Sequence, residues 1–259
     1  MPTPAAPSIK AVILDVDGTV ATCPYDFEAM RAAVARAAEK WGWQSTGSEP
    51  RGVVERIAFI ADELSDDGPG FREEAERAVV ELELAGARAS ELLPGAAEAL
   101  TRLREGGIKI GLITRNCRPA TEMVLSRMNS AGERSSAALL SYDLVLTRDD
   151  VPRVKPDPDH VHQALALLGC SPREAAVVGD HRFDMEAGRA AGAALCIGVR
   201  SGTSSEEELL AAGAEVVIDT VAELPRCLAG QGLPGGENTG PERTRRTGGQ
   251  GNCGPLLGR

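Results

Sequence analysis

Residues 9–19 read IKAVILDVDGT, an aliphatic run that ends in two aspartates, a glycine and a threonine. Residues 9–14 have the continuous apolar character of a strand buried on both faces of a parallel sheet. Similar short runs recur along the chain, at 108–113, 143–146, 175–178, 194–199 and 215–218. Segments with helical periodicity lie between them, at 95–105, 117–129, 157–168, 183–191 and 205–212. This alternation predicts an α/β fold with a mainly parallel central sheet.

The stretch after the first strand breaks this rhythm. Helical patterns occupy 27–41, 50–64 and 71–89, and no strand-like run lies among them. A small helical domain is therefore expected over 20–93, inserted into a core domain that comprises 9–19 and 94–229. The ends, 1–8 and 230–259, are rich in proline, glycine and polar residues and are expected to be disordered.

Composition excludes several classes of protein. The net charge is −10 and only 3% of residues are aromatic, which argues against a nucleic-acid partner. The six cysteines form no C-x-x-C pair and there are three histidines, so neither a zinc site nor a disulfide scaffold is expected. The absence of a signal-peptide pattern or an apolar spanning run favours a cytoplasmic protein with no membrane partner.

The first strand ends in Asp15 and Asp17, where open α/β sheets bind ligands. Two carboxylates this close repel each other, so they suggest a bound cation or a retained proton. Gly18 permits a sharp turn that would direct backbone N–H groups at an anion. Taken alone, the Asp-Gly pair is more typical of an ordinary turn.

Three further segments place polar residues beside later strands. Thr114, Arg115 and Asn116 follow the second strand, and Lys155 precedes a helix in a chain with only four lysines. Taken alone, Thr114 is more typical of a helix N-cap and Lys155 of a surface residue. Asp180 and Asp184 follow the fourth strand and, with Asp15 and Asp17, form an oxygen-rich set suited to Mg²⁺.

In order, spacing and strand context, these four segments resemble the motifs of the haloacid dehalogenase superfamily. The matching segments are DVDGT at 15–19, Thr114, Lys155 within VKPDPD, and GDHRFD at 179–184. Residues 20–93 resemble the helical cap of its phosphoglycolate phosphatase and β-phosphoglucomutase branch. The resemblance implies a Rossmann-like core in which the first strand lies between the second and the fourth.

The resemblance also implies a Mg²⁺-dependent phosphatase acting on a small phosphorylated metabolite. Asp15 would attack phosphorus and form an aspartyl-phosphate, and Asp17 would act as general acid and base. Thr114 and Lys155 would hold the phosphate oxygens. Candidates for the metal are Asp15, the backbone carbonyl of Asp17 and Asp180, with Asp184 orienting these ligands, and candidates for substrate binding are Gly18, Thr19, Arg115 and Asn116.

Other activities remain open within this resemblance. A dehalogenase or a phosphonate hydrolase is expected to lack Asp17, and the latter needs a cap lysine, for which only Lys40 is available. A sugar-phosphate mutase shares the same catalytic residues, and a non-catalytic binding protein of the same fold is the remaining alternative. The segment VATCPYDF at 20–27 departs from the commoner family loop, which argues against specificity for phosphoglycolate. A monomer or a homodimer is expected.

Overall fold

The computed structural model describes residues 8–22, 24–135 and 140–230. Nearly all of the two ends that were expected to be disordered lies outside these residues. In the described residues the core is a parallel sheet in the order β3-β2-β1-β4-β5-β6. Its strands are β1 (Ala11–Asp15), β2 (Lys109–Ile113), β3 (Leu144–Leu146), β4 (Ala175–Gly179), β5 (Leu195–Val199) and β6 (Val216–Ile218). The predicted α/β class with a parallel sheet is confirmed.

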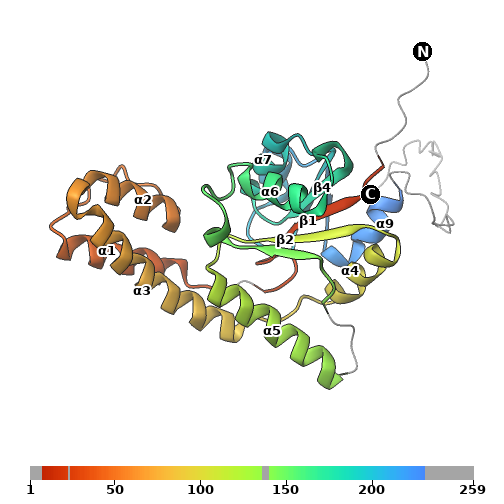
Figure 1. Ribbon diagram of the computed structural model, residues 1–259, viewed down its shortest axis with the longest axis horizontal. Helices are drawn as coiled ribbons and strands as arrows, with labels where there is room; N and C mark the ends of the chain where they lie inside the picture. The colour runs from red at the N-terminus through yellow and green to blue at the C-terminus, as the bar shows by residue number, and fades with distance from the viewer. Residues whose placement is uncertain (1–7, 23, 136–139, 231–259) are drawn as a thin grey trace, which may run out of the picture.

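Helices cover both faces of this sheet (Figure 1). One face packs against α4 (Ala96–Glu105), α5 (Arg118–Ser135) and α9 (Leu224–Ala229). The other face packs against α6 (Asp159–Leu168), α7 (Arg182–Ala191) and α8 (Glu206–Ala211). Single 3-10 turns lie at 148–150, 172–174 and 221–223.

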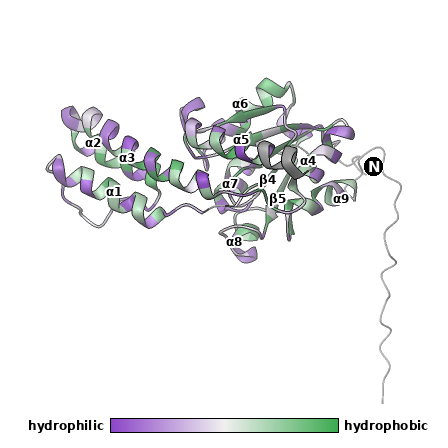
Figure 2. Ribbon diagram, turned by 90° about the horizontal axis from the view of Figure 1, so that it is seen from below, coloured by the Kyte–Doolittle hydropathy of each residue, from purple (hydrophilic) through white to green (hydrophobic). Residues whose placement is uncertain are grey.

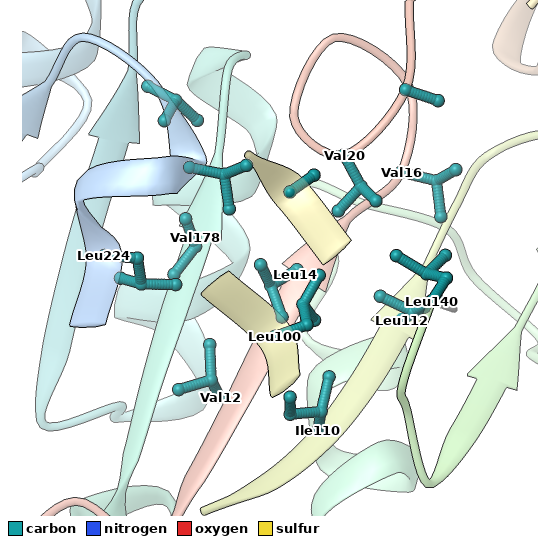
Figure 3. Packing of buried hydrophobic residues seen from close by; sticks show 14 of the residues in the cluster. Val12, Leu14, Val16, Val20, Leu100, Ile110, Leu112, Leu140, Val178 and Leu224 are labelled. Carbon is teal, nitrogen blue, oxygen red and sulfur yellow. The ribbon is translucent and has the colours of Figure 1, made fainter. Parts of the chain in front are cut away.

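The side chains of β1 alternate between the two faces of the sheet and are apolar on both, which explains why β1 lies at the centre of the fold. Val12 and Leu14 point into the cluster shared with α4 and α9, where Leu100 and Leu224 meet them (Figure 3). Ala11 and Ile13 point to the opposite face. All five β1 residues are buried, as expected for a strand covered on both sides.

The register of β1 with its neighbours places three strand ends together. Asp15 pairs with Ile113 of β2, and Leu14 pairs with Val178 of β4. The residues that follow β1, β2 and β4 therefore meet at one edge of the sheet. This arrangement confirms the predicted position of the first strand between the second and the fourth.

Helices α1 (Phe27–Lys40), α2 (Val53–Glu63) and α3 (Gly68–Ala89), with a 3-10 turn at 65–67, form a helical lobe beside the sheet (Figure 1). The lobe has its own apolar cluster, which includes Val34, Ile60 and Phe71. Hydrophobic and hydrophilic stretches alternate along its helices, whereas β4 and β5 are hydrophobic (Figure 2). None of the helices in the described ranges is long and apolar enough to cross a membrane.

Two short segments connect the lobe to the core, and they lie side by side. Thr22 N–H donates to the Glu91 carbonyl at 2.8 Å, and Leu93 N–H donates to the Val20 carbonyl at 2.9 Å. Both lobe connections therefore leave the core at one place, next to the carboxyl end of β1. The domain boundaries expected at 20 and 93 stay a prediction.

Candidate active site

The edge of the sheet where β1, β2 and β4 end carries a buried acidic cluster. Carboxylate oxygens of Asp15, Asp180 and Asp184 lie within 4.8 Å of one another, and all three residues are buried. Asp15 is the last residue of β1, while Asp180 lies between β4 and α7. Asp184 lies in the first turn of α7, where its Oδ2 accepts the His181 N–H at 3.0 Å. Three strand and helix ends thus bring these acids together.

Lys155 provides the positive charge nearest to this cluster. Its Nζ lies 2.5 Å from Asp15 Oδ1 and 2.6 Å from Asp184 Oδ1, and its side chain is only 2% exposed. Burial alone would lower the pKa of Lys155, but the two carboxylates raise it above its usual value. The lysine therefore remains charged and fixes the orientation of both aspartates.

One ammonium group does not balance the buried acids. Burial raises the pKa of Asp15 well above its usual value; Lys155 opposes this effect, while Asp184 and Asp180 add to it. Burial and the neighbouring Asp184 raise the pKa of Asp180 to about 6. The cluster holds three carboxyl groups beside one ammonium group, and clustered carboxylate oxygens are the donors that a hard divalent cation prefers. The donor set therefore fits a metal ion such as Mg²⁺.

Asp17 lies beside this cluster and is held by the loop after β2. Its Oδ2 accepts hydrogen bonds from Thr114 Oγ1 at 2.8 Å and from Asn116 Nδ2 at 2.9 Å. Burial raises the pKa of Asp17 to about 6, although hydrogen bonds from Thr114 and Tyr25 oppose the rise. Thr114 and Asn116, expected to contact substrate, thus also orient Asp17.

Gly18 and Thr19 pack against Asp180 and are not among the residues that line the cavity. Gly18 has φ of +91°, and an added Cβ would lie 2.6 Å from Asp180 Oδ2. Its N–H, which was expected to face an anion, donates to the Ala21 carbonyl at 2.7 Å, and the Thr19 hydroxyl lies 3.4 Å from Asp180 Oδ1. A direct substrate contact by either residue stays a prediction. In the structure both residues lie against Asp180.

Sequence reasoning missed the loop after β5. Thr203 donates to Asp180 Oδ2 from its backbone N–H at 2.8 Å and from its hydroxyl at 3.1 Å. Ser201 Oγ donates to the Gly18 carbonyl at 2.7 Å. The run SGTSS at 201–205 lies at the same edge of the sheet, so the rule that ligands gather at strand ends was the signal available.

A cavity of about 330 Å³ opens above the acids, between the core and the helical lobe. Of the predicted residues, its walls include those from all four motif segments: Asp15, Asp17, Thr114, Arg115, Asn116, Lys155, Asp180 and Asp184. The lobe side contributes Tyr25, Phe27, Met30, Arg31, Arg51, Val53 and Val54. Lys40 is not among the lining residues, and its Nζ pairs with Glu74 at 2.6 Å. The cavity therefore joins the acidic cluster to lobe residues that no motif indicated.

Two ion pairs connect the lobe to the segments after β2 and β3. Arg115 Nη2 lies 2.5 Å from Glu55 Oε1 of α2, and the Arg115 guanidinium lies 5.0 Å from the centre of the Phe183 ring. Glu83 of α3 pairs with the buried Arg148 and also accepts the Cys117 N–H at 3.4 Å. The lobe thus contacts the segment whose residues hydrogen-bond to Asp17.

The family model of haloacid dehalogenase-like hydrolases matches residues 9–192. Among curated proteins, Pyrophosphatase PpaX of Bacillus velezensis is 39% identical over 95 residues, which are 37% of this chain and 40% of that protein. The chain therefore spans about 40% of the length of the curated relatives it matches.

Two solved structures resemble the chain over most of its length. A hydrolase from Pseudomonas syringae is 25% identical, with a TM-score of 0.59, over 86% of this chain and 98% of that one. A protein from Thermotoga maritima described as a β-phosphoglucomutase is 26% identical, with a TM-score of 0.52, over 86% of this chain and 99% of that one. The structural neighbours thus include the branch that the motifs and the helical insertion indicated.

Proposed function

The chain belongs to the haloacid dehalogenase-like hydrolases, and we propose that it is a Mg²⁺-dependent phosphatase that hydrolyses a small phosphorylated metabolite. The observation that carries this proposal is the position of Asp15 at the base of the cavity, held by Lys155 and flanked by Asp17. Pyrophosphatase PpaX, which matches part of the chain, is by its name a hydrolase of a phosphorylated compound, and this supports the same class of reaction. The expected cytoplasmic location stays a prediction.

In the proposed reaction Asp15 is the nucleophile. Lys155 holds Asp15 Oδ1, whereas Asp15 Oδ2 accepts no hydrogen bond from any described residue. Oδ2 would form a bond to phosphorus while the bond from phosphorus to the leaving oxygen breaks, giving an aspartyl-phosphate. Lys155 fixes the carboxylate for this attack and offsets the charge of the incoming phosphate.

Asp17 is proposed to move the proton. In its neutral form it would protonate the leaving oxygen, and as a carboxylate it would then take a proton from the water that hydrolyses the aspartyl-phosphate. Thr114 and Asn116 hold Oδ2 of Asp17 and so fix the direction of this transfer. Residues of the lobe line one side of the cavity and would limit the access of other water molecules.

The acidic cluster is the proposed Mg²⁺ site. Asp15, Asp180 and the backbone carbonyl of Asp17 would hold the ion, with Asp184 turned toward Lys155 as an orienting group. A bound Mg²⁺ would supply charge neutralisation of the phosphate oxygens.

The test is Asp15→Asn assayed with p-nitrophenyl phosphate in the presence of Mg²⁺. We expect turnover to fall by about 10³-fold or more, because the amide cannot form the acyl-phosphate. Circular dichroism checks that the variant folds, and Asp66→Asn, on the 3-10 turn of the lobe, is the control that retains activity. An unchanged rate in folded Asp15→Asn would exclude this mechanism, whereas no turnover by the wild-type protein would leave the non-catalytic alternative.

A sugar-phosphate mutase is the second candidate, favoured by the likeness to the Thermotoga maritima protein. A mutase would use the same Asp15, Asp17 and Lys155, but would return the phosphoryl group to a second hydroxyl. Incubation with a hexose 1-phosphate and a bisphosphate activator separates the two activities. A phosphatase releases inorganic phosphate in proportion to substrate consumed, whereas a mutase releases little and accumulates the 6-phosphate.

A further inference from the structure

The cavity is lined by three of the few aromatic residues of this chain, two next to the lobe and one from the core. The sequence has four Phe, two Trp and two Tyr, and three of these eight residues line the cavity: Tyr25, Phe27 and Phe183. The rings of Tyr25 and Phe27 lie 6.4 Å apart at an angle of 51°. Tyr25 is buried in the apolar cluster of the lobe, and Phe183 packs against His181, Arg115 and Arg182, which leaves Phe27 as the ring without such packing.

Phe27 is the residue that core packing leaves unexplained. It is 42% exposed, and the other exposed large hydrophobic residues in the described ranges are Leu167 and Leu210, which do not line the cavity. Met30, Val53 and Val54 extend the apolar wall along α1 and α2. An exposed phenyl ring on a concave apolar wall is stabilised when a ligand covers it, because apolar surface is removed from water.

The neutral polar groups of the cavity are already engaged at its acidic end. Thr114 and Asn116 donate to Asp17, and Thr203 donates to Asp180. The lobe wall adds no serine, threonine, asparagine or glutamine from the described residues. Recognition of a sugar needs several such groups directed at its hydroxyls, since unpaired polar groups are costly to bury. The wall is therefore poorly suited to a polyhydroxylated leaving group.

Charged side chains also line the cavity, namely Arg31, Arg51 and Glu83 from the lobe and Arg115 from the loop after β2. Arg31 pairs with Glu28 at 2.8 Å, and Arg115 pairs with Glu55 at 2.5 Å. Arg51 is exposed and forms no ion pair within the part of the chain that the structure describes. Because Glu28 is 91% exposed, its pair with Arg31 is weak, and Arg31 and Arg51 together make a substrate with a second anionic group the competing choice to the apolar wall.

We propose that the substrate is a phosphomonoester of an alcohol with an apolar, ring-sized carbon skeleton, which the wall formed by Phe27, Met30, Val53 and Val54 covers. This inference rests on the phosphatase function proposed above. A volume of about 330 Å³ suffices for a phosphate and one ring, since a cavity of about 150 Å³ already holds benzene. Phe183 closes the same space from the core side.

The test compares kcat/KM for benzyl phosphate, glycerol 1-phosphate, glucose 6-phosphate and phosphoglycolate. All four are esters of primary alcohols, so differences report recognition of the leaving group more than its chemistry. We expect benzyl phosphate to exceed glycerol 1-phosphate by about tenfold, the effect of covering one ring-sized apolar group. A higher kcat/KM for glucose 6-phosphate or for phosphoglycolate than for benzyl phosphate would overturn the proposal. Preference for phosphoglycolate would assign recognition on the lobe side to Arg31 and Arg51.

Phe27→Ala is the matching variant. We expect the ratio of benzyl phosphate to glycerol 1-phosphate to fall by about fivefold, because the ring that covers the substrate is lost. Leu210→Ala removes an exposed hydrophobic side chain of α8 that does not line the cavity, and it should leave the ratio unchanged. An unchanged ratio in Phe27→Ala would contradict the proposal.

Binding separates this inference from the proposed function. Calorimetry on Asp15→Asn compares benzylphosphonate with methylphosphonate, neither of which has a scissile ester oxygen. Tighter binding of benzylphosphonate by about tenfold supports the apolar wall even if no phosphomonoester is hydrolysed. Equal binding of the two phosphonates overturns the apolar wall even if p-nitrophenyl phosphate is hydrolysed and Asp15→Asn abolishes that activity.

Discussion

At the scale of single residues, the site depends on side chains held in one orientation by their neighbours. Lys155 is fixed by two carboxylates, and Asp17 by a hydroxyl and an amide from the loop after β2. Gly18 is required because its positive φ and its contact with Asp180 leave no room for a side chain. A few close contacts therefore set the geometry on which the proposed chemistry depends.

Protonation of His160 is expected to change the stability of the fold rather than the candidate active site. It is fully buried in α6, and its Nε2 lies 3.0 Å from the Thr147 carbonyl. Burial lowers the pKa of His160 from 6.5 to about 4. Between these two values the unfolded chain takes up a proton and the folded chain does not. The contribution of His160 to the unfolding free energy is therefore fully present above pH 6.5 and is lost as the pH falls toward 4.

The unfolding free energy of the wild type includes a loss from His160 when the pH is lowered from about 7 to about 5. We expect this loss to be smaller in His160→Gln by about 1 to 2 kcal/mol. Urea unfolding at the two pH values measures this difference. The comparison with wild type is needed because Asp17 and Asp180, with raised pKa values, shift stability in the opposite direction. His162→Gln on the same helix is the control. Equal pH dependence in wild type and His160→Gln would contradict the assignment.

At the scale of elements, the C-terminal half of α3 does more than complete the lobe. Glu83 pairs with Arg148 just after β3, and their side chains are 4% and 12% exposed. Arg148 also donates to the Arg115 carbonyl at 3.3 Å. The pair thus joins α3 to the loop that orients Asp17, and neither residue belongs to a sequence motif.

Glu83→Gln is expected to lower the unfolding free energy by about 3 kcal/mol, because it leaves the buried Arg148 charge without its partner. Denaturant unfolding measures the loss. Glu73→Gln is the control on the same helix, since its pair with Arg77 is 77% and 66% exposed and should contribute less than about 0.5 kcal/mol. The double variant Glu83→Gln, Arg148→Met should recover part of the loss, and strict additivity would contradict the coupling.

The elements also show where sequence patterns place boundaries poorly. The helix expected from 71 begins at Gly68, because Pro69 lies in its first turn, where the missing N–H costs nothing. The helix expected from 183 begins at Arg182 with His181 as its N-cap, so Asp184 lies in its first turn and Asp180 lies outside it. The two acids still meet, since Asp180 lies in the tight turn between β4 and α7.

At the scale of the whole molecule, the net charge is −10, and several of the acidic residues are buried together at the edge of the sheet. Four aspartates, Asp15, Asp17, Asp180 and Asp184, face one lysine there. A cation bound at this point offsets repulsion that burial makes strong. Binding to the folded state alone stabilises it by mass action.

We expect about 5 mM Mg²⁺ to raise the melting temperature by several degrees, at about 2 to 4 °C for each kcal/mol of binding free energy. Differential scanning fluorimetry at constant ionic strength measures the shift. Asp180→Asn should abolish it, and should not lower the melting temperature without Mg²⁺, because the variant removes an uncompensated buried charge. Asp66→Asn, on the lobe surface, is the control. An equal Mg²⁺ shift in Asp180→Asn would exclude the proposed site.

The sequence by itself determined the fold class and the motif residues of the candidate site. Each buried strand is a local run of apolar residues, and parallel strands necessarily bring their carboxyl ends to one edge. Asp15, Asp17, Thr114, Lys155, Asp180 and Asp184 could therefore be placed together without coordinates, and all of them line one cavity.

Only the tertiary structure decided what faces those residues. Phe27 and Val53 meet the acids across the cavity, and Glu83 reaches Arg148 from 65 positions away. No local period encodes these contacts, because they depend on how the helical lobe packs against the core. The proposed chemistry was thus readable from short motifs, while the wall that would select the substrate exists only once two separate hydrophobic clusters have folded and met.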